Sequence, residues 1–169
     1  LKVGDLSKLH LAETLAKTVG DYLDSYRLLT TTLQVREPHY LGIKVQAEIV
    51  PFEYSRPEIV RTRVIESLKN FISPLVLAAD QAQQDDLMGP DWEGWPFGRN
   101  LYLAEIFSLI QRVPGVKHVL DVQISQRPVT PGQESPPEAE EEQEKTETPL
   151  KQKLVQVPAD TLLCSLDHE

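Results

Sequence analysis

The 169 residues of this chain suffice for one modest domain, or for one domain with an extension. Hydrophobic residues make up 40% and charged residues 25%, which is ordinary for a globular protein. No run approaches the roughly 18 apolar residues of a membrane-spanning helix, so we expect no direct membrane insertion. The single cysteine, Cys164, excludes an intrachain disulfide.

The net charge of −9 is concentrated in one stretch of the sequence. Residues 134–149 hold seven Glu and one Lys, a net of −6, so the rest of the chain carries only −3. The folded part is therefore almost neutral. Because no basic stripe with interleaved aromatic residues is present, we expect no nucleic-acid partner.

The first half of the chain predicts a helix followed by two strands. Leu11, Leu15, Val19, Tyr22 and Tyr26 recur at helical spacing and form one apolar face. A first short strand is then expected at 33–35, before a proline interrupts pairing. The second and clearest strand covers 43–49, where apolar and polar residues alternate, which predicts a sheet covered on one side.

Two further helices and a strand are predicted before residue 126. Ser55-Arg56-Pro57-Glu58 resembles a capping box, and the helix that follows should bury Val60, Val64, Leu68 and Phe71. Residues 78–99 look irregular. A third helix at 101–113 presents Leu103, Ile106, Phe107 and Ile110 on one face, and a strand follows with Leu120, Val122 and Ile124 alternating. The order predicts an α+β domain, a small mixed sheet with helices packed on one face, over residues 1–126.

The remaining sequence divides into a linker and a tail. Residues 127–150 are rich in Pro and Glu and have little to bury, which predicts a flexible, disordered acidic linker. Residues 151–169 contain two short apolar patches, at 154–157 and 162–164. We expect this short β tail to dock either on the domain or on a neighbouring protein.

No pattern in the sequence predicts catalysis or metal binding. His10, His39, His118 and His168 fall in four different elements without metal-ligand spacing. Ser165-Leu166-Asp167-His168 contains the residue types of a catalytic triad, but neighbours in sequence cannot align the three groups. We therefore predict no catalytic, metal-binding or cofactor-binding residues and no enzyme activity. A hydrolase that uses Cys164 stays open as a third alternative, and thiol alkylation would test it.

Aromatic residues gather in the segment that precedes the third helix. Trp92, Trp95 and Phe97 lie among Gly and Pro, and Arg99 follows them. Such side chains pin a loop onto its own core or onto a partner more often than they stack on sugars. Aromatic and Arg residues are also frequent interface anchors. We predict that Trp92, Trp95, Phe97 and Arg99 bind a partner, with a carbohydrate-binding domain using Trp92 and Trp95 as the alternative.

Several strings in this region resemble one known family. They are Gly94-Trp95-Pro96-Phe97-Gly98-Arg99, Leu101-Tyr102-Leu103-Ala104-Glu105-Ile106 and Arg112-Val113-Pro114-Gly115-Val116, with Tyr22-Leu23-Asp24 and Val35-Arg36-Glu37-Pro38 upstream. In this order they are similar to the carboxy-terminal region of the baseplate J-like, or putative baseplate assembly, family. The polar insertion at 80–87 and the long acidic linker depart from that pattern.

The resemblance implies a structural wedge subunit in the baseplate of a contractile phage tail or injection system. Members of the family form wedges around a central hub and are longer than this chain. Expected partners are other wedge subunits, further copies of the chain, and sheath-initiator and hub proteins. The resemblance also implies assembly in the bacterial cytoplasm, as part of a phage tail or tail-like particle.

Overall fold

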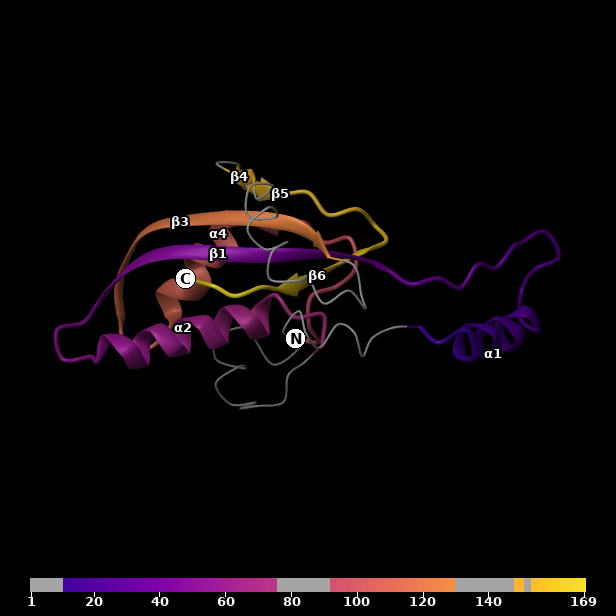
Figure 1. Ribbon diagram of the computed structural model, residues 1–169, viewed down its shortest axis with the longest axis horizontal. Coiled ribbons are helices and arrows are strands. Elements are labelled where there is room, and N and C mark those ends of the chain that lie inside the picture. The colour runs from indigo at the N-terminus through magenta and orange to yellow at the C-terminus, as the bar shows by residue number, and fades with distance from the viewer. Residues whose placement is uncertain (1–10, 76–91, 130–147, 151–152) are drawn as a thin grey trace, which may run out of the picture.

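The computed structural model describes residues 11–75, 92–129, 148–150 and 153–169. The chain folds as an α+β protein, as predicted, with helices and a mixed sheet (Figure 1). The elements in chain order are α1 (Glu13–Asp24), β1 (His39–Pro51), α2 (Pro57–Phe71), β2 (Leu101–Tyr102), α4 (Leu103–Arg112), β3 (Val116–Val129), β4 (Thr148–Leu150), β5 (Leu154–Val155) and β6 (Thr161–Ser165).

Two long strands, β1 and β3, form the centre of the main sheet. Its order is β4-β3-β1-β6, with β1 antiparallel to β3 and parallel to β6. The predicted strand at 43–49 lies inside β1, and its apolar residues Ile43 and Val45 are fully buried. The main sheet continues beyond the predicted boundary at 126, because β3 pairs with β1 up to Val129.

The strand alternation predicted around Leu120 is wrong at that residue. The register of β1 and β3 shifts there, since Glu48 pairs with Asp121 but Ile49 pairs with Val119. Leu120 is thus the extra residue of a β-bulge, which redirects its side chain. It is 58% exposed, whereas Val122 and Ile124 face the core as predicted.

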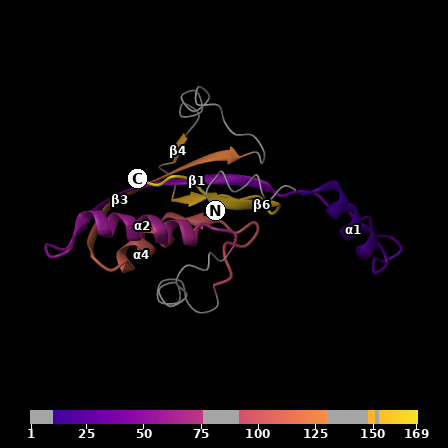
Figure 2. The same cartoon turned by 60° about the horizontal axis from the view of Figure 1, so that its bottom comes forward.

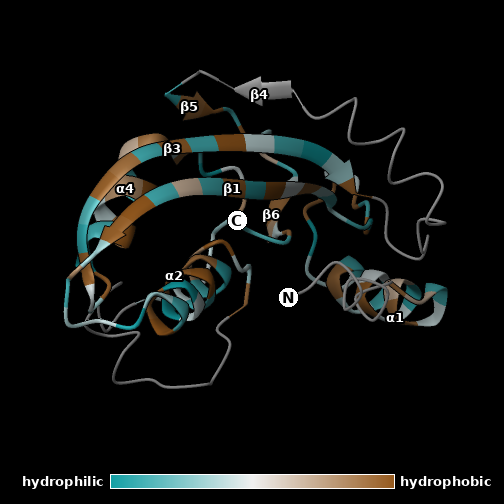
Figure 3. Cartoon of the chain, turned by 60° about the vertical axis from the view of Figure 1, so that its left-hand side comes forward, coloured by the Kyte–Doolittle hydropathy of each residue, from teal (hydrophilic) through white to brown (hydrophobic). Residues whose placement is uncertain are grey.

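Helices α2 and α4 lie on the concave side of the curved β1–β3 pair (Figure 3). The predicted buried face of α2 is confirmed, and Ile106 and Ile110 of α4 are buried as expected. The capping box expected for α2 is wrong, because Arg56 is the N-cap and no side chain caps the helix. The main core includes Ile43, Val45, Val60, Val64, Leu68, Phe71, Trp95, Leu101, Ile106, Leu109, Ile110, Val122, Ile124, Val155 and Leu163.

The end of the chain completes the sheet. β6 runs parallel to the first residues of β1, and residues 166–169 continue along the same edge through backbone hydrogen bonds at Ile43, Val45 and Ala47. β5 pairs with β2, just ahead of α4. The tail thus lies on its own domain, one of the two arrangements left open above. The predicted linker lies outside the described residues except at 127–129 and 148–150.

Helix α1 lies apart from the rest of the molecule, at the end of an extended segment (Figures 1 and 2). Residues 31–38 are irregular, so the strand predicted at 33–35 is wrong. Among the described residues, no strand pairs with this segment, and apolar alternation alone does not make a strand. The helix is amphipathic as predicted, yet none of its residues is buried.

Candidate interaction site

Phe71, Trp92 and Trp95 form an aromatic cluster at the end of α2. The ring of Phe71 stacks on Trp92 at a centroid distance of 5.3 Å and meets Trp95 edge-on at 5.2 Å. The two indoles are 6.0 Å apart at 66°. Edge-to-face and offset arrangements of this kind are favourable beyond their buried area. The cluster therefore fixes the loop before α4 to the core.

Two glycines let the loop approach its neighbours closely. Gly94 and Gly98 have positive φ angles of 100° and 63°, where a side chain would be strained. A Cβ atom on Gly94 would lie 2.8 Å from the carbonyl oxygen of Pro74, and one on Gly98 would lie 2.8 Å from the Cα atom of Ala159. The Trp95 amide also donates to Ser73 O at 2.7 Å. The loop is thus tied to α2 on one side and to the tail on the other.

Arg99 closes the cluster from outside. Its guanidinium carbon lies 4.6 Å from the ring centroid of Trp95 and 5.7 Å from that of Trp92. The same group donates a 2.6 Å hydrogen bond to Glu105, whose second oxygen accepts from the Tyr102 amide at the start of α4. Arg99 therefore links the loop to α4, and 40% of its side chain stays exposed.

The four residues predicted to bind a partner differ in how much surface they offer. The structure brings Trp92, Trp95 and Arg99 together, but Trp95 is only 1% exposed and can contact no partner while the loop stays closed. Trp92 is partly buried. Phe97 is 58% exposed, without a ring contact to any described aromatic residue. Partner binding by this loop stays a prediction, and Phe97 has the side chain best placed for it.

The same geometry bears on the carbohydrate-binding alternative. A sugar-stacking platform needs an exposed aromatic face. Trp95 has none, since Phe71 and Arg99 lie against its ring, and one face of Trp92 is stacked on Phe71. The described residues thus give this pair of indoles little free surface for a sugar.

Ser165 and His168 are hydrogen-bonded to each other, although the sequence predicts no catalytic triad at these residues. Ser165 Oγ and His168 Nε2 lie 2.8 Å apart, and His168 Nδ1 accepts from the Val45 amide at 3.1 Å. Since Nδ1 accepts, Nε2 carries the proton and donates to Ser165, which in turn donates to Leu166 O. A catalytic base would need the opposite tautomer, with Nδ1–H held by a carboxylate.

The surroundings of His168 agree with a structural role. Asp167, the third member of the sequence pattern, points to solvent with 97% exposure and faces Lys69 at 3.6 Å. Burial, reinforced by the nearby Lys69, lowers the pKa of His168 from 6.5 to about 4. The imidazole is therefore neutral at physiological pH and joins the tail to β1.

Cys164 is also buried beside β1. It is 0% exposed and packs with Tyr40 in a small second core. Burial raises the pKa of its thiol to about 12. A reactive cysteine needs the opposite shift and access to solvent, so this environment does not suit a nucleophile.

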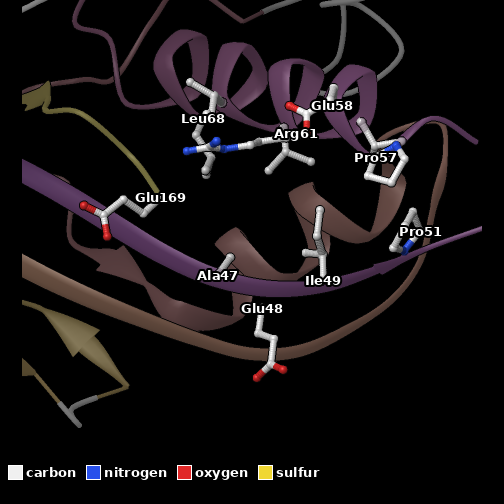
Figure 4. A pocket seen from close by; sticks show the side chains of 12 residues that line it. Ala47, Glu48, Ile49, Pro51, Pro57, Glu58, Arg61, Leu68 and Glu169 are labelled. Atoms are coloured by element: carbon white, nitrogen blue, oxygen red, sulfur yellow. The ribbon is translucent and has the colours of Figure 1, made fainter.

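Two features of the structure were not predicted as sites. One is the exposed apolar face of α1, formed by Leu15 (54% exposed), Val19 (36%), Tyr22 (64%) and Leu23 (39%). The other is a pocket of about 320 Å³ between β1 and α2 (Figure 4). The spacing in α1 was visible in the sequence, but spacing does not reveal whether the face is covered. The pocket is lined by the same apolar positions that predict a core, so no sequence signal marked it.

Among the described residues, no group of three His, Cys, Asp or Glu side chains is arranged to hold a metal ion. No helix in the described ranges is long and apolar enough to span a membrane. No family model matches the chain, and no curated protein is similar to it.

Proposed function

We propose that this chain is a structural assembly domain, a wedge subunit of the baseplate of a contractile tail or injection system. It acts through protein–protein contacts and not through catalysis. The observation that carries the assembly role is helix α1, an amphipathic helix whose apolar face is exposed and which lies apart from its own domain.

The length of α1 explains why it needs a partner. It has 12 residues, and an isolated helix of fewer than about 12–15 residues is marginal in water. Most of a helix's stability in proteins comes from packing its apolar face. Here Leu15, Val19 and Tyr22 have no described core to pack on, so a neighbouring molecule supplies one. An exposed apolar surface of this kind is typical of an interaction site.

The attachment of α1 suits a helix that reaches toward a neighbour. Residues 25–38 join it to β1 without regular structure. A hydrogen bond from the Leu11 amide to Glu37 and an ion pair between Arg36 and Asp160 at 2.9 Å hold the base of this segment. The helix is thus presented at a distance from the domain, while its connection starts from a fixed point on the sheet.

The choice of a baseplate rests on the resemblance described above. Its most specific string includes Gly94, Trp95, Gly98 and Arg99, all of which position the loop before α4. In this proposal Trp95 and its neighbours in that string hold the loop in place, and Phe97 and α1 contact other subunits. The proposed partners are other wedge subunits, further copies of the chain, and sheath-initiator and hub proteins. The proposed setting is a tail or tail-like particle assembled in the bacterial cytoplasm.

Variants of α1 test this function in cells that produce the particle. Leu15→Glu with Tyr22→Glu places charge on the exposed face and should leave the domain folded, because neither residue is buried. We expect electron microscopy to show few or no complete baseplates. Ile59→Glu is the matched control, since Ile59 is 45% exposed on α2 of the domain body. Normal baseplates from the α1 variant, or particles that lack the chain, would contradict the proposal.

A further inference from the structure

Residues 167–169 follow β6 along the edge of β1, and one buried side chain holds them there. Asp167 and Glu169 are exposed, whereas His168 is only 5% exposed. Leu166, which precedes them, is buried against Gly42, where an added Cβ atom would lie 2.9 Å from a Leu166 methyl carbon. β6 and Leu166 therefore have packing of their own, and the burial of His168 decides whether the next residues stay on the strand.

The His168 ring takes the place of a backbone carbonyl in this pairing. The Glu169 amide donates to Val45 O at 3.0 Å, and the Glu169 carbonyl accepts from the Ala47 amide at 2.9 Å. The Val45 amide, which lies between these two bonds, donates to His168 Nδ1 at 3.1 Å. Val45 is fully buried, so its amide needs this acceptor for as long as residues 167–169 cover it.

A second proton on the ring would turn that acceptor into a donor. In the neutral ring Nε2–H donates to Ser165 and Nδ1 accepts from Val45, whereas in the protonated ring both nitrogens are donors. Two N–H groups would then face each other, and a charge would be buried without a partner. The arrangement on β1 is therefore suited to the neutral ring alone.

The charged groups around the ring do not compensate a buried cation. On the α2 side, Lys69 lies 3.6 Å from Asp167, and Arg61 of the same helix acts on Glu169. On β1, Lys44 pairs with Glu169 at 3.0 Å. Both carboxylates of the segment thus already face cations, and three positive side chains surround the place where the imidazolium would form.

The pKa of the ring follows from these surroundings. Burial, reinforced by Lys69 and opposed by Asp167, lowers the pKa of His168 from 6.5 to about 4. Above about pH 6.5 the ring is neutral whether the segment is bound or released, so the bound form keeps its full advantage. As the pH falls from there toward 4, only the released form takes up the proton, and its share of the population rises.

We propose that residues 167–169 form an acid-opened latch, which lies on β1 while His168 is neutral and leaves the strand when the ring is protonated, with β6, the rest of the sheet and the helices still folded. Opening frees the backbone groups of Val45 and Ala47 at this edge. The latch is a property of the isolated chain and does not depend on the proposed assembly role.

Amide exchange of two neighbouring residues tests the latch on the unchanged chain. The Ala47 amide is bonded to Glu169, whereas the alternation of β1 directs the Gln46 amide to β3, where Gln46 pairs with Gln123. Between about pH 7.5 and about pH 5, the protection of Ala47, corrected for the intrinsic rate, should fall by about thirtyfold. That of Gln46 should fall by less than about threefold. An equal fall at both amides, or none at Ala47, would overturn the proposal.

Two substitutions identify the group that takes up the proton. His168→Asn keeps an acceptor for the Val45 amide but does not titrate, so the protection of Ala47 should change by less than about twofold over the same range. Glu169→Gln is the control, because bonds from Lys44 and Gln46 hold the pKa of that carboxyl below its ordinary 4.5. It should keep the thirtyfold effect of the unchanged chain, about the same within twofold. An undiminished acid effect in His168→Asn, or its loss in Glu169→Gln, would show that His168 does not operate the latch.

Discussion

Arg99 and Trp95 hold each other in place through two different contacts. The Trp95 indole nitrogen donates to the Arg99 carbonyl at 3.0 Å, and the Arg99 guanidinium lies 4.6 Å from the Trp95 ring centroid. The Arg99 backbone thus holds the edge of the Trp95 indole, and the Arg99 side chain covers its face. This pair makes the loop before α4 a stable part of the domain.

Replacing Arg99 should therefore lower stability. Arg99→Ala removes the contact with the indoles and the partner of Glu105, and we expect the free energy of unfolding to fall by about 1–2 kcal/mol. Arg99→Lys keeps the charge but loses the planar fork and should recover only part of this. Urea denaturation measures both. An Arg99→Ala variant as stable as the unchanged chain would show that the contact contributes nothing.

Substitution of Trp95 should lower the stability of the chain strongly and substitution of Phe97 should not, although the two residues are only two positions apart. Trp95→Ala removes a fully buried side chain and should cost about 3–5 kcal/mol in stability. Phe97→Ala removes an exposed one, so its effect on unfolding should stay below about 0.5 kcal/mol. If the loop binds a partner, Phe97→Ala should instead reduce incorporation into particles. A Phe97→Ala variant that melts far below the unchanged chain would assign that side chain to the fold.

The tail should loosen in mild acid because of His168. Its pKa is about 4 in the folded chain against 6.5 ordinarily, so the unfolded state binds a proton first as the pH falls. Stability should be intact above about pH 6.5, decline down to about pH 4 by on the order of 3 kcal/mol, and then level off for this group. His168→Asn keeps an acceptor for the Val45 amide and should lack this slope. Parallel pH profiles for the two proteins between pH 4 and pH 6.5 would contradict the assignment.

Cys164 should resist alkylation while the chain is folded. With a pKa of about 12 and no exposed surface, its thiol is both protonated and inaccessible at pH 8. We expect iodoacetamide to label it only at urea concentrations that unfold the chain, as followed by mass spectrometry. Labelling of the folded chain at the rate of free cysteine would revive the alternative of a catalytic thiol.

Much of the domain was predictable because, within each element, the apolar residues recur at the period of a strand or of a helix. The alternation from Ile43 to Ile49 and the helical spacing from Val60 to Phe71 each match a buried face. The bulge at Leu120 was not predictable, because an extra residue in one strand leaves no mark in the sequence of its partner. The parallel pairing of the tail with β1 depends on contacts across more than 100 residues, which local patterns do not contain.

The candidate sites were harder to predict than the fold. The sequence predicts partner binding for both Trp95 and Phe97, and only their exposure in the structure shows that Trp95 belongs to the core and Phe97 to the surface. In α1, Leu15 and Tyr22 had the spacing of a packed face, but period does not show whether the packing partner belongs to the same chain. The pocket at Ala47 lies between β1 and α2, and the space left between two packed elements is a property of the folded chain that no local sequence pattern contains.

The measurement that tests the assembly role most directly is amide hydrogen exchange in α1, compared between the free chain and the assembled particle. In the free chain, residues 13–24 have no buried side chain and should exchange far faster than the β1 amides paired with β3. In the particle, a neighbouring subunit should cover Leu15, Val19 and Tyr22 and slow exchange along the whole helix. Exchange in α1 that is equally fast in both states would contradict the account.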